Sequence, residues 1–325
     1  MDLTSLNPFA MRALHFSPPG GPEKLTLLTD HPTPTATDLK PDELLVNVHA
    51  AGLIWTELFW PIYQDTNTGA YRTHIPGRDF SGVVVNGIKA GDEVFGMISS
   101  AESAGAMAEY VVVHRDAVAL KPKNLSWEEA AAVPLSALTA WQAFKTHSSV
   151  MAGTKVLVTG AAGGTGVFAV PLAKMMGAKV VGTAGSKEGS ELLRKLDVDK
   201  VVDYKTEDLV EVLGEGSVNV VLDTVGGEVF EKCLKVVKKE DQGGMLVSIN
   251  TFDAEARAKD VGVKAKFFIV TADGSALAEI GDLLEQGKLE AFVDTVFPLE
   301  KAVDAWKQAM DGHVHGKIVV RVARA

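Results

Sequence analysis

Residues 155–177, KVLVTGAAGGTGVFAVPLAKMMG, decide the fold. A short apolar run at 156–158 leads into a glycine-rich turn, and a helical pattern follows until Gly177 ends it. A strand, a glycine turn and a helix in this order form the opening unit of a dinucleotide-binding fold. The stretch therefore predicts a doubly wound parallel sheet that binds a nucleotide.

The glycines of this turn have separate tasks. Gly163 lets the backbone approach a pyrophosphate, and Gly166 allows the helix to pack closely on the strand. Ala161 takes the first position of the glycine motif, which is thus an A-x-G-x-x-G variant. Glycine turns also occur in flavodoxin-like and methyltransferase folds, but the flanking strand and helix favour a dinucleotide. We expect the phosphates to be bound by Ala162, Gly163, Gly164, Thr165 and Gly166.

Composition narrows the class of protein. The chain has 325 residues, enough for two domains, and 46% hydrophobic and 23% charged residues are ordinary for a globular protein. The net charge of −10 argues against a general nucleic-acid or membrane binder. The single cysteine, Cys233, excludes an internal disulfide and a multi-cysteine metal site. Because neither a secretory signal nor a membrane span is evident, we expect a cytoplasmic protein.

The hydrophobic pattern changes once along the chain. Short strands at 11–16, 25–30, 43–51, 79–86, 93–98 and 108–114 predict an all-β region. At Ser126 a capping-box pattern opens an alanine-rich helix, which Pro134 interrupts. Strands then alternate with helices from residue 155 to about 270, which predicts a parallel sheet. Residues 316–322 form a final strand.

The residues after the second strand of the sheet indicate the cofactor. NAD-dependent enzymes place an acidic residue there to bind the ribose 2′-hydroxyl. This chain has Gly185, Ser186 and Lys187 instead. A hydroxyl and an ammonium suit a 2′-phosphate, which a carboxylate would repel. The pattern favours NADPH over NADH, although Ser186 and Lys187 also suit a simple surface turn.

Motifs along most of the chain resemble one family. They are IPGRDFSGVV at 75–84, AGDEVFG at 90–96, GAMAEYV at 105–111, AAAVPLSALTAW at 130–141, VVDYKTED at 201–208, LDTVGG at 222–227 and HGKIVVRV at 315–322. Together with the glycine turn they resemble the zinc-independent medium-chain dehydrogenases/reductases, in the quinone oxidoreductase and enoyl reductase branch. The resemblance implies a GroES-like catalytic domain at 1–125, completed by about 285–325. A Rossmann NADPH-binding domain at 126–284 is inserted between these parts.

The resemblance also implies cofactor contacts. Tyr204 matches a tyrosine that binds the 2′-phosphate beside Ser186 and Lys187. Thr139 matches a position beside the nicotinamide ring. Further positions that line the nicotinamide match Asn250, Phe268, Ile269 and Val270, whose residue types also suit an ordinary core or turn.

The residues at the expected ligand positions argue against a zinc site. Zinc-dependent relatives carry a cysteine and a histidine where this chain has Ile54 and Arg78, and neither side chain here can bind zinc. We therefore expect no metal. Many quinone and enoyl reductases carry Asn-Pro-x-x-Asp where this chain has Ile54-Trp55-Thr56-Glu57, so the resemblance does not fix the substrate.

The expected reaction is hydride transfer from NADPH to an α,β-unsaturated carbonyl or a quinone. Tyr63 and Tyr71 are the candidate catalytic proton donors, with water as the alternative. A short-chain-reductase mechanism is excluded because no tyrosine is followed by a lysine four residues later. A non-catalytic NADPH-binding protein of the same fold remains the alternative function. The resemblance further implies a homodimer formed through an edge of the Rossmann sheet.

Overall fold

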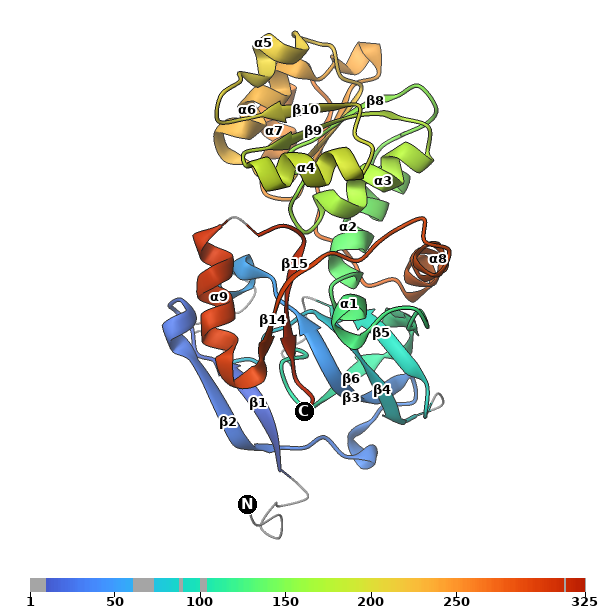
Figure 1. Cartoon of the computed structure of the whole chain (residues 1–325), viewed down its shortest axis with the longest axis vertical. Helices are drawn as coiled ribbons and strands as arrows, with labels where there is room; N and C mark the ends of the chain where they lie inside the picture. The colour runs from blue at the N-terminus through green and yellow to red at the C-terminus, as the bar shows by residue number, and fades with distance from the viewer. Residues whose placement is uncertain (1–9, 61–72, 88–89, 100–103, 313, 325) are drawn as a thin grey trace. The chain divides into compact units, whose positions relative to one another are not determined.

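The computed structural model describes residues 10–60, 73–87, 90–99, 104–312 and 314–324. The chain divides into two compact units (Figure 1). The β-rich unit comprises Met1–Leu135, Thr271–Gly287 and Ala291–Ala325, and the Rossmann unit comprises Ser136–Val270 with Lys288–Glu290. The sequence placed the two borders near 125 and 285. The helices on either side, α1 (Trp127–Ala131) and α8 (Gly274–Glu285), pack instead on strands of the β-rich unit.

The β-rich unit contains a hairpin and a seven-stranded sheet. In the larger sheet the order is β14-β15-β3-β4-β5-β7, and β6 pairs with β3. The sheet strands are β3 (Glu43–Gly52), β4 (Asp79–Asn86), β5 (Glu93–Met97), β6 (Tyr110–His114), β7 (Val118–Leu120), β14 (Val293–Pro298) and β15 (Lys317–Arg321). The hairpin pairs β1 (Ala10–Phe16) with β2 (Leu25–Pro32). Short strands were predicted for most of this region, but β7 and β14 were not.

Local signals set the start of the two helices that follow. The Ser126 hydroxyl accepts the N–H of Glu129, and the Glu129 carboxylate accepts the N–H of Ser126 at 2.8 Å. The predicted capping box is thus confirmed at α1. Pro134 then begins α2 (Pro134–Lys145), because proline fits the first turn of a helix but not its interior.

The Rossmann unit is built on six parallel strands in the order β10-β9-β8-β11-β12-β13. Numbered from β8, this is the 3-2-1-4-5-6 order of dinucleotide-binding sheets. The strand order reverses between β8 and β11, and sheets of this topology bind ligands beyond the carboxyl ends of the two strands at the reversal. The bounds are β8 (Lys155–Val158), β9 (Lys179–Ala184), β10 (Lys200–Asp203), β11 (Val220–Asp223), β12 (Met245–Ser248) and β13 (Ala265–Phe267).

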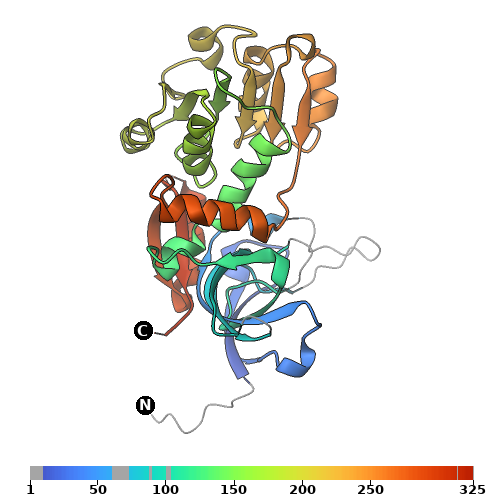
Figure 2. The same cartoon turned by 90° about the vertical axis from the view of Figure 1, so that its right-hand side faces the viewer.

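Helices cover both faces of this sheet. In Figures 1 and 2, α3 (Gly166–Met175) and α4 (Lys187–Lys195) lie on one side of the strands, and α6 (Gly227–Val236) lies on the other. The Ser186 hydroxyl caps α4 by accepting the N–H of Gly189. Two short helices, α5 (Leu209–Leu213) and α7 (Ala254–Lys259), were not predicted. A further helix of the β-rich unit, α9, spans Ala302–Asp311.

Within the described residues, no helix has the length and apolarity needed to cross a membrane.

Candidate cofactor site

The glycine turn after β8 has the shape that a pyrophosphate requires. Gly160 adopts a left-handed conformation with φ of +58°, and its N–H donates to the Thr183 hydroxyl at 2.9 Å. A Cβ added at Gly166 would lie 2.3 Å from the carbonyl oxygen of Ala161. Only glycine therefore lets the start of α3 approach the turn this closely. The sequence predicted this role for Gly166 but missed the positive φ of Gly160.

The start of α3 fits a phosphate. A Cβ added at Gly163 would meet one atom within 4 Å, the carbonyl oxygen of Gly160 at 3.2 Å, so the backbone faces open space there. Ala162 is buried, and Gly163, Gly164 and Thr165 are half-buried. The first N–H groups of a helix lack partners within the helix, and the helix dipole attracts negative charge to them. These residues fit the pyrophosphate of a dinucleotide.

The three residues expected at the 2′-phosphate come together where two neighbouring strands end. Ala184 of β9 lies opposite Asp203 of β10, so Ser186 and Tyr204 each follow just after this pair. The Tyr204 ring lies directly against Gly185: a Cβ added to that glycine would be 2.2 Å from the ring.

The exposure of these side chains suits a bound anion. The Tyr204 residue is 58% exposed, and the Lys187 side chain is 82% exposed. The Lys187 ammonium lies 3.9 Å from the Glu191 carboxylate, and a pair this exposed is weak. The ammonium can therefore turn toward a phosphate.

The residues expected near the nicotinamide differ in how far their side chains are exposed. Asn250 follows β12, is exposed, and donates from its amide to the carbonyl oxygen of Thr224 at 2.5 Å. Thr139 is buried in α2. Phe268 is also buried, and its ring centre lies 4.4 Å from that of His147. Ile269 is exposed and Val270 is half-buried.

Sequence reasoning missed the polar groups that fix these loops. Thr159, Asp223 and Ser248 are buried and lie at or just after the ends of the apolar strands β8, β11 and β12. Buried polar groups at strand ends need hydrogen-bond partners, which is a signal that could have marked them. Their hydrogen bonds join the three loops at the carboxyl edge of the sheet.

Arg78, at the position of the zinc-ligating histidine, belongs to a buried ion pair with Glu57. Arg78 Nε lies 2.9 Å from the Glu57 carboxylate, and both side chains are fully buried. The other Glu57 oxygen accepts the Gly77 N–H at 2.9 Å, and the Arg78 guanidinium also donates to the carbonyl oxygen of Ser99 at 3.0 Å. Ile54, at the cysteine position, is half-buried and apolar. The position of the histidine ligand therefore holds the positively charged guanidinium of Arg78, which cannot bind zinc.

A second buried pair follows directly along the chain. Asp79 lies 2.9 Å from the Lys317 ammonium and accepts the N–H of Leu135 at 2.6 Å. Burial raises the pKa of Asp79, and the Lys317 charge partly offsets this. Among the described residues, no group of three His, Cys, Asp or Glu side chains could hold a metal ion.

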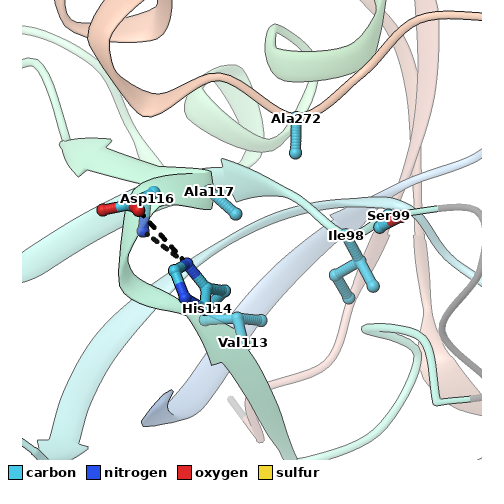
Figure 3. A pocket seen from close by; sticks show the side chains of 7 residues that line it. All are labelled: Ile98, Ser99, Val113, His114, Asp116, Ala117 and Ala272. Carbon is cyan, nitrogen blue, oxygen red and sulfur yellow. Dashed lines mark hydrogen bonds and ion pairs between the residues drawn. The ribbon is translucent and has the colours of Figure 1, made fainter. Parts of the chain in front are cut away.

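The proposed proton donors Tyr63 and Tyr71 lie outside the described residues. A small cavity of about 130 Å³ in the β-rich unit is lined by Ile98, Ser99, Val113, His114, Asp116, Ala117 and Ala272 (Figure 3). Its His114 ring accepts the N–H of Asp116 at 3.2 Å. Ligand pockets usually measure about 300–1,000 Å³, so we do not assign the substrate to this cavity.

Comparisons with known proteins agree with this fold. Residues 40–123 match the alcohol dehydrogenase GroES-like domain, and residues 196–320 match the zinc-binding dehydrogenase family. A probable zinc-binding mitochondrial oxidoreductase of Arthroderma benhamiae is 34% identical over 92% of this chain and 93% of its own. The NADPH-dependent chloroplastic alkenal/one oxidoreductase of Arabidopsis thaliana is 31% identical over 96% and 80%.

A solved structure extends the match to three dimensions. The quinone oxidoreductase from Coxiella burnetii superimposes with a TM-score of 0.86 at 30% identity, over 97% of this chain and all of that one. Sequence motifs, strand order and relatives thus agree, and the predicted pairing of a GroES-like domain with a Rossmann domain is confirmed. The chain belongs to the medium-chain dehydrogenase/reductase superfamily, in its quinone oxidoreductase branch.

Proposed function

We propose that this protein is an NADPH-dependent reductase that transfers hydride to an α,β-unsaturated carbonyl or a quinone without zinc. The observation that carries the proposal is the grouping of Ser186, Lys187 and Tyr204 at the ends of β9 and β10. No acidic residue stands at the end of β9 to repel a 2′-phosphate. Two relatives, named as an NADPH-dependent alkenal/one oxidoreductase and a quinone oxidoreductase, support both the cofactor and the substrate class.

Bound NADPH supplies the hydride, and the chain's residues hold it in place. The N–H groups at the start of α3 bind the pyrophosphate, while Ser186, Lys187 and Tyr204 bind the 2′-phosphate. At the nicotinamide end the contacts come from Thr139, Asn250, Phe268, Ile269 and Val270. Because these contacts already fix the nicotinamide ring, less entropy is lost when the hydride is transferred.

The negative charge that develops on the substrate oxygen must then be protonated or hydrogen-bonded. In this proposal Tyr63 or Tyr71 donates the proton, and water replaces them if neither tyrosine is needed. Arg78 takes no direct part, because its guanidinium is buried against Glu57 and Ser99.

The test is the loss of NADPH absorbance with a series of enones and, separately, a series of quinones. Turnover on enones alone makes the protein an ene-reductase and predicts that Tyr63→Phe or Tyr71→Phe lowers kcat. Turnover on quinones alone makes it a quinone reductase with little need for a protein acid. Tight NADPH binding with no turnover on either series would favour the non-catalytic alternative, to which the loss of the Asn-Pro-x-x-Asp sequence also points.

The assembly and compartment are part of the same proposal. We propose a homodimer formed through β13, one of the two edge strands of the Rossmann sheet, beside which Phe252 is 71% exposed. Light scattering on the wild type and Phe252→Asp tests the dimer, since a monomeric wild type would contradict it.

We also propose a cytoplasmic location. Cell fractionation tests this location, because relatives named above are mitochondrial or chloroplastic.

A further inference from the structure

One buried carboxylate lies at the centre of the carboxyl edge of the Rossmann sheet. Asp223 ends β11, is fully buried, and accepts four hydrogen bonds. One oxygen accepts the Thr159 hydroxyl at 3.0 Å and the N–H groups of Val225 and Gly226 at 3.1 and 3.0 Å. The other oxygen accepts the Ser248 hydroxyl at 2.8 Å. All four donors are neutral, so the carboxylate organises polar groups rather than a cation.

The hydroxyl groups of Thr159 and Ser248 connect Asp223 to the neighbouring loops through further hydrogen bonds. Thr159 Oγ1 accepts the N–H of Thr224 at 2.9 Å. Ser248 Oγ accepts the N–H of Asn250 at 3.3 Å and that of Thr251 at 3.1 Å. The loops after β8, β11 and β12 therefore share one anchor.

The direction of each hydrogen bond requires a carboxylate. Because the Ser248 oxygen already accepts two N–H groups, its own hydrogen must point to Asp223, and the Thr159 hydroxyl donates to Asp223 as well. Asp223 thus faces four donors, and only an ionised carboxylate offers enough acceptors on both oxygens. An asparagine of the same shape would turn its NH₂ group toward one or more of these donors.

Position in the fold connects the anchor with the cofactor. A dinucleotide-binding sheet consists of two mononucleotide-binding halves. Ser186 and Tyr204 belong to the half of β8, β9 and β10, whereas Asp223 and Asn250 belong to the half of β11, β12 and β13. The anchored loop also contains Gly226, whose φ of +77° a side chain would strain.

We propose that Asp223 is a positioning residue: through Ser248 and the N–H groups of Val225 and Gly226 it sets the shape of the loops after β11 and β12, which hold the nicotinamide half of the cofactor. The inference rests on the proposed NADPH function and deepens it. Asp223 acts on the reaction through these loops and not by touching the reacting atoms.

The experiment compares two ligands on Asp223→Asn. NADPH spans both halves of the sheet, whereas adenosine 2′,5′-bisphosphate reaches only the half with Ser186, Lys187 and Tyr204. We expect Asp223→Asn to weaken NADPH binding by about tenfold or more, and to leave the affinity for the bisphosphate within about twofold of wild type.

Asp199→Asn is the matched control. Asp199 also accepts a backbone N–H in the Rossmann unit, that of Val180 at 2.6 Å, but at the amino end of β9. This variant should bind both ligands as the wild type does. If Asp223→Asn does not fold, Ser248 carries the test: Ser248→Ala should weaken NADPH binding, and Ser248→Thr, which keeps the hydroxyl, should restore it.

Two results would overturn the inference. Unchanged NADPH affinity in Asp223→Asn and Ser248→Ala would show that the loops keep their shape without the anchor. An equal loss of both ligands would show that the residue supports the whole unit rather than the nicotinamide half. A wild type without NADPH affinity would instead contradict the proposed function itself.

Discussion

Single side chains decide which cofactor the site accepts. Lys187 brings a positive charge to the start of α4, and its salt bridge to Glu191 is long and exposed. Lys187→Ala should therefore raise the KM for NADPH by about tenfold or more, because a charge-assisted contact with the 2′-phosphate is lost. The KM for NADH, which lacks that phosphate, should change by less than about twofold.

Steady-state kinetics with both cofactors measure this effect. Lys195→Ala, at the other end of the same helix, is the control and should behave as wild type. Equal losses with NADPH and NADH would show that Lys187 does not contact the 2′-phosphate.

Cys233 illustrates how burial controls reactivity. The thiol is fully buried in α6, and burial, together with the charge of Asp223, raises its pKa well above the ordinary value of 9.0. Since the thiolate is the reactive form, an aromatic disulfide reagent should modify the native protein at least about a hundredfold more slowly than the denatured protein. Rapid labelling of the folded protein would contradict this burial.

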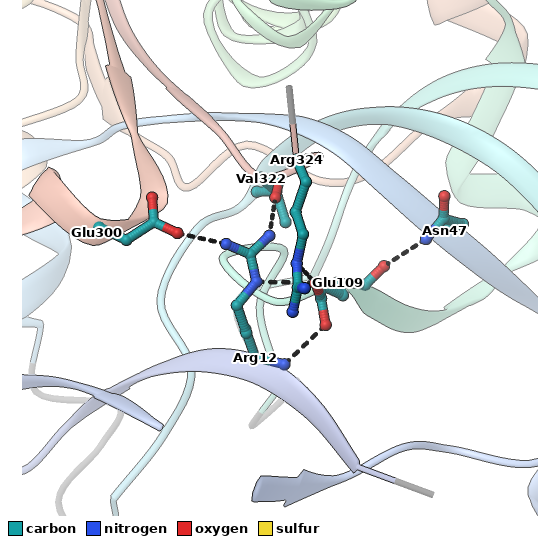
Figure 4. A network of polar contacts seen from close by, with 6 residues as sticks. All are labelled: Arg12, Asn47, Glu109, Glu300, Val322 and Arg324. Atoms are coloured by element: carbon teal, nitrogen blue, oxygen red, sulfur yellow. Dashed lines mark hydrogen bonds and ion pairs between the residues drawn. The ribbon is translucent and has the colours of Figure 1, made fainter. Parts of the chain in front are cut away.

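Among elements, a polar network joins segments that are distant in the sequence (Figure 4). Arg12 of β1 donates to Glu109 at 2.8 Å and to the carbonyl oxygen of Val322, just after β15, at 2.7 Å, and it also pairs with Glu300. The guanidinium holds three acceptors in a fixed geometry that an ammonium cannot reproduce.

Arg12→Lys should therefore lower the free energy of unfolding by about 1–3 kcal/mol, because the buried carbonyl oxygen of Val322 and the half-buried Glu109 lose donors. Unfolding in guanidinium chloride, followed by tryptophan fluorescence, measures this loss of stability. Trp306 in the same core is fully buried. Arg115→Lys, in an exposed pair with Asp42, is the control and should cost less than about 1 kcal/mol. Equal costs in both variants would show that the buried network adds no stability.

The start of β9 should respond to acid. Burial alone would raise the pKa of Asp199, but the Val180 N–H and the Lys174 ammonium outweigh it, and the pKa lies below its ordinary value of 3.8. A lowered folded-state pKa stabilises the fold above the unfolded value, and this contribution disappears as the pH falls through the folded value.

Urea unfolding of the wild type and Asp199→Asn across the acid range checks the sign. The stability difference should be constant, at no more than about 1 kcal/mol, near neutral pH and should shrink below pH 3.8. A difference that grows in acid would mean that the folded-state pKa is raised.

For the whole molecule, local sequence signals predicted most of the architecture. The glycine turn, the capping box at Ser126 and the alternating strands depend on neighbouring residues, so the sequence shows them directly. The short elements α5, α7, β7, β13 and β14 were missed, because three to six residues carry too little periodicity and tertiary packing stabilises them.

For the cofactor site, the sequence predicted which residues take part but not which of them are in contact. The absence of an acid beside Ser186 and Lys187 could be read directly, and the resemblance supplied Tyr204. The packing of Tyr204 on Gly185 joins residues 19 positions apart, and the Asp223 network joins strand ends 64 positions apart. Such pairings depend on strand order, which a single sequence does not reveal.

The central claim is reduction with NADPH in the absence of zinc, and one measurement tests it most directly. The protein is treated with a strong chelator, its zinc content is determined by elemental analysis, and NADPH consumption is followed with the best enone or quinone acceptor. Because Arg78 stands at the position of the zinc-ligating histidine and is buried against Glu57, we expect the zinc-free enzyme to retain the full NADPH-dependent rate. Loss of the rate on chelation and its recovery when zinc is restored would contradict the account.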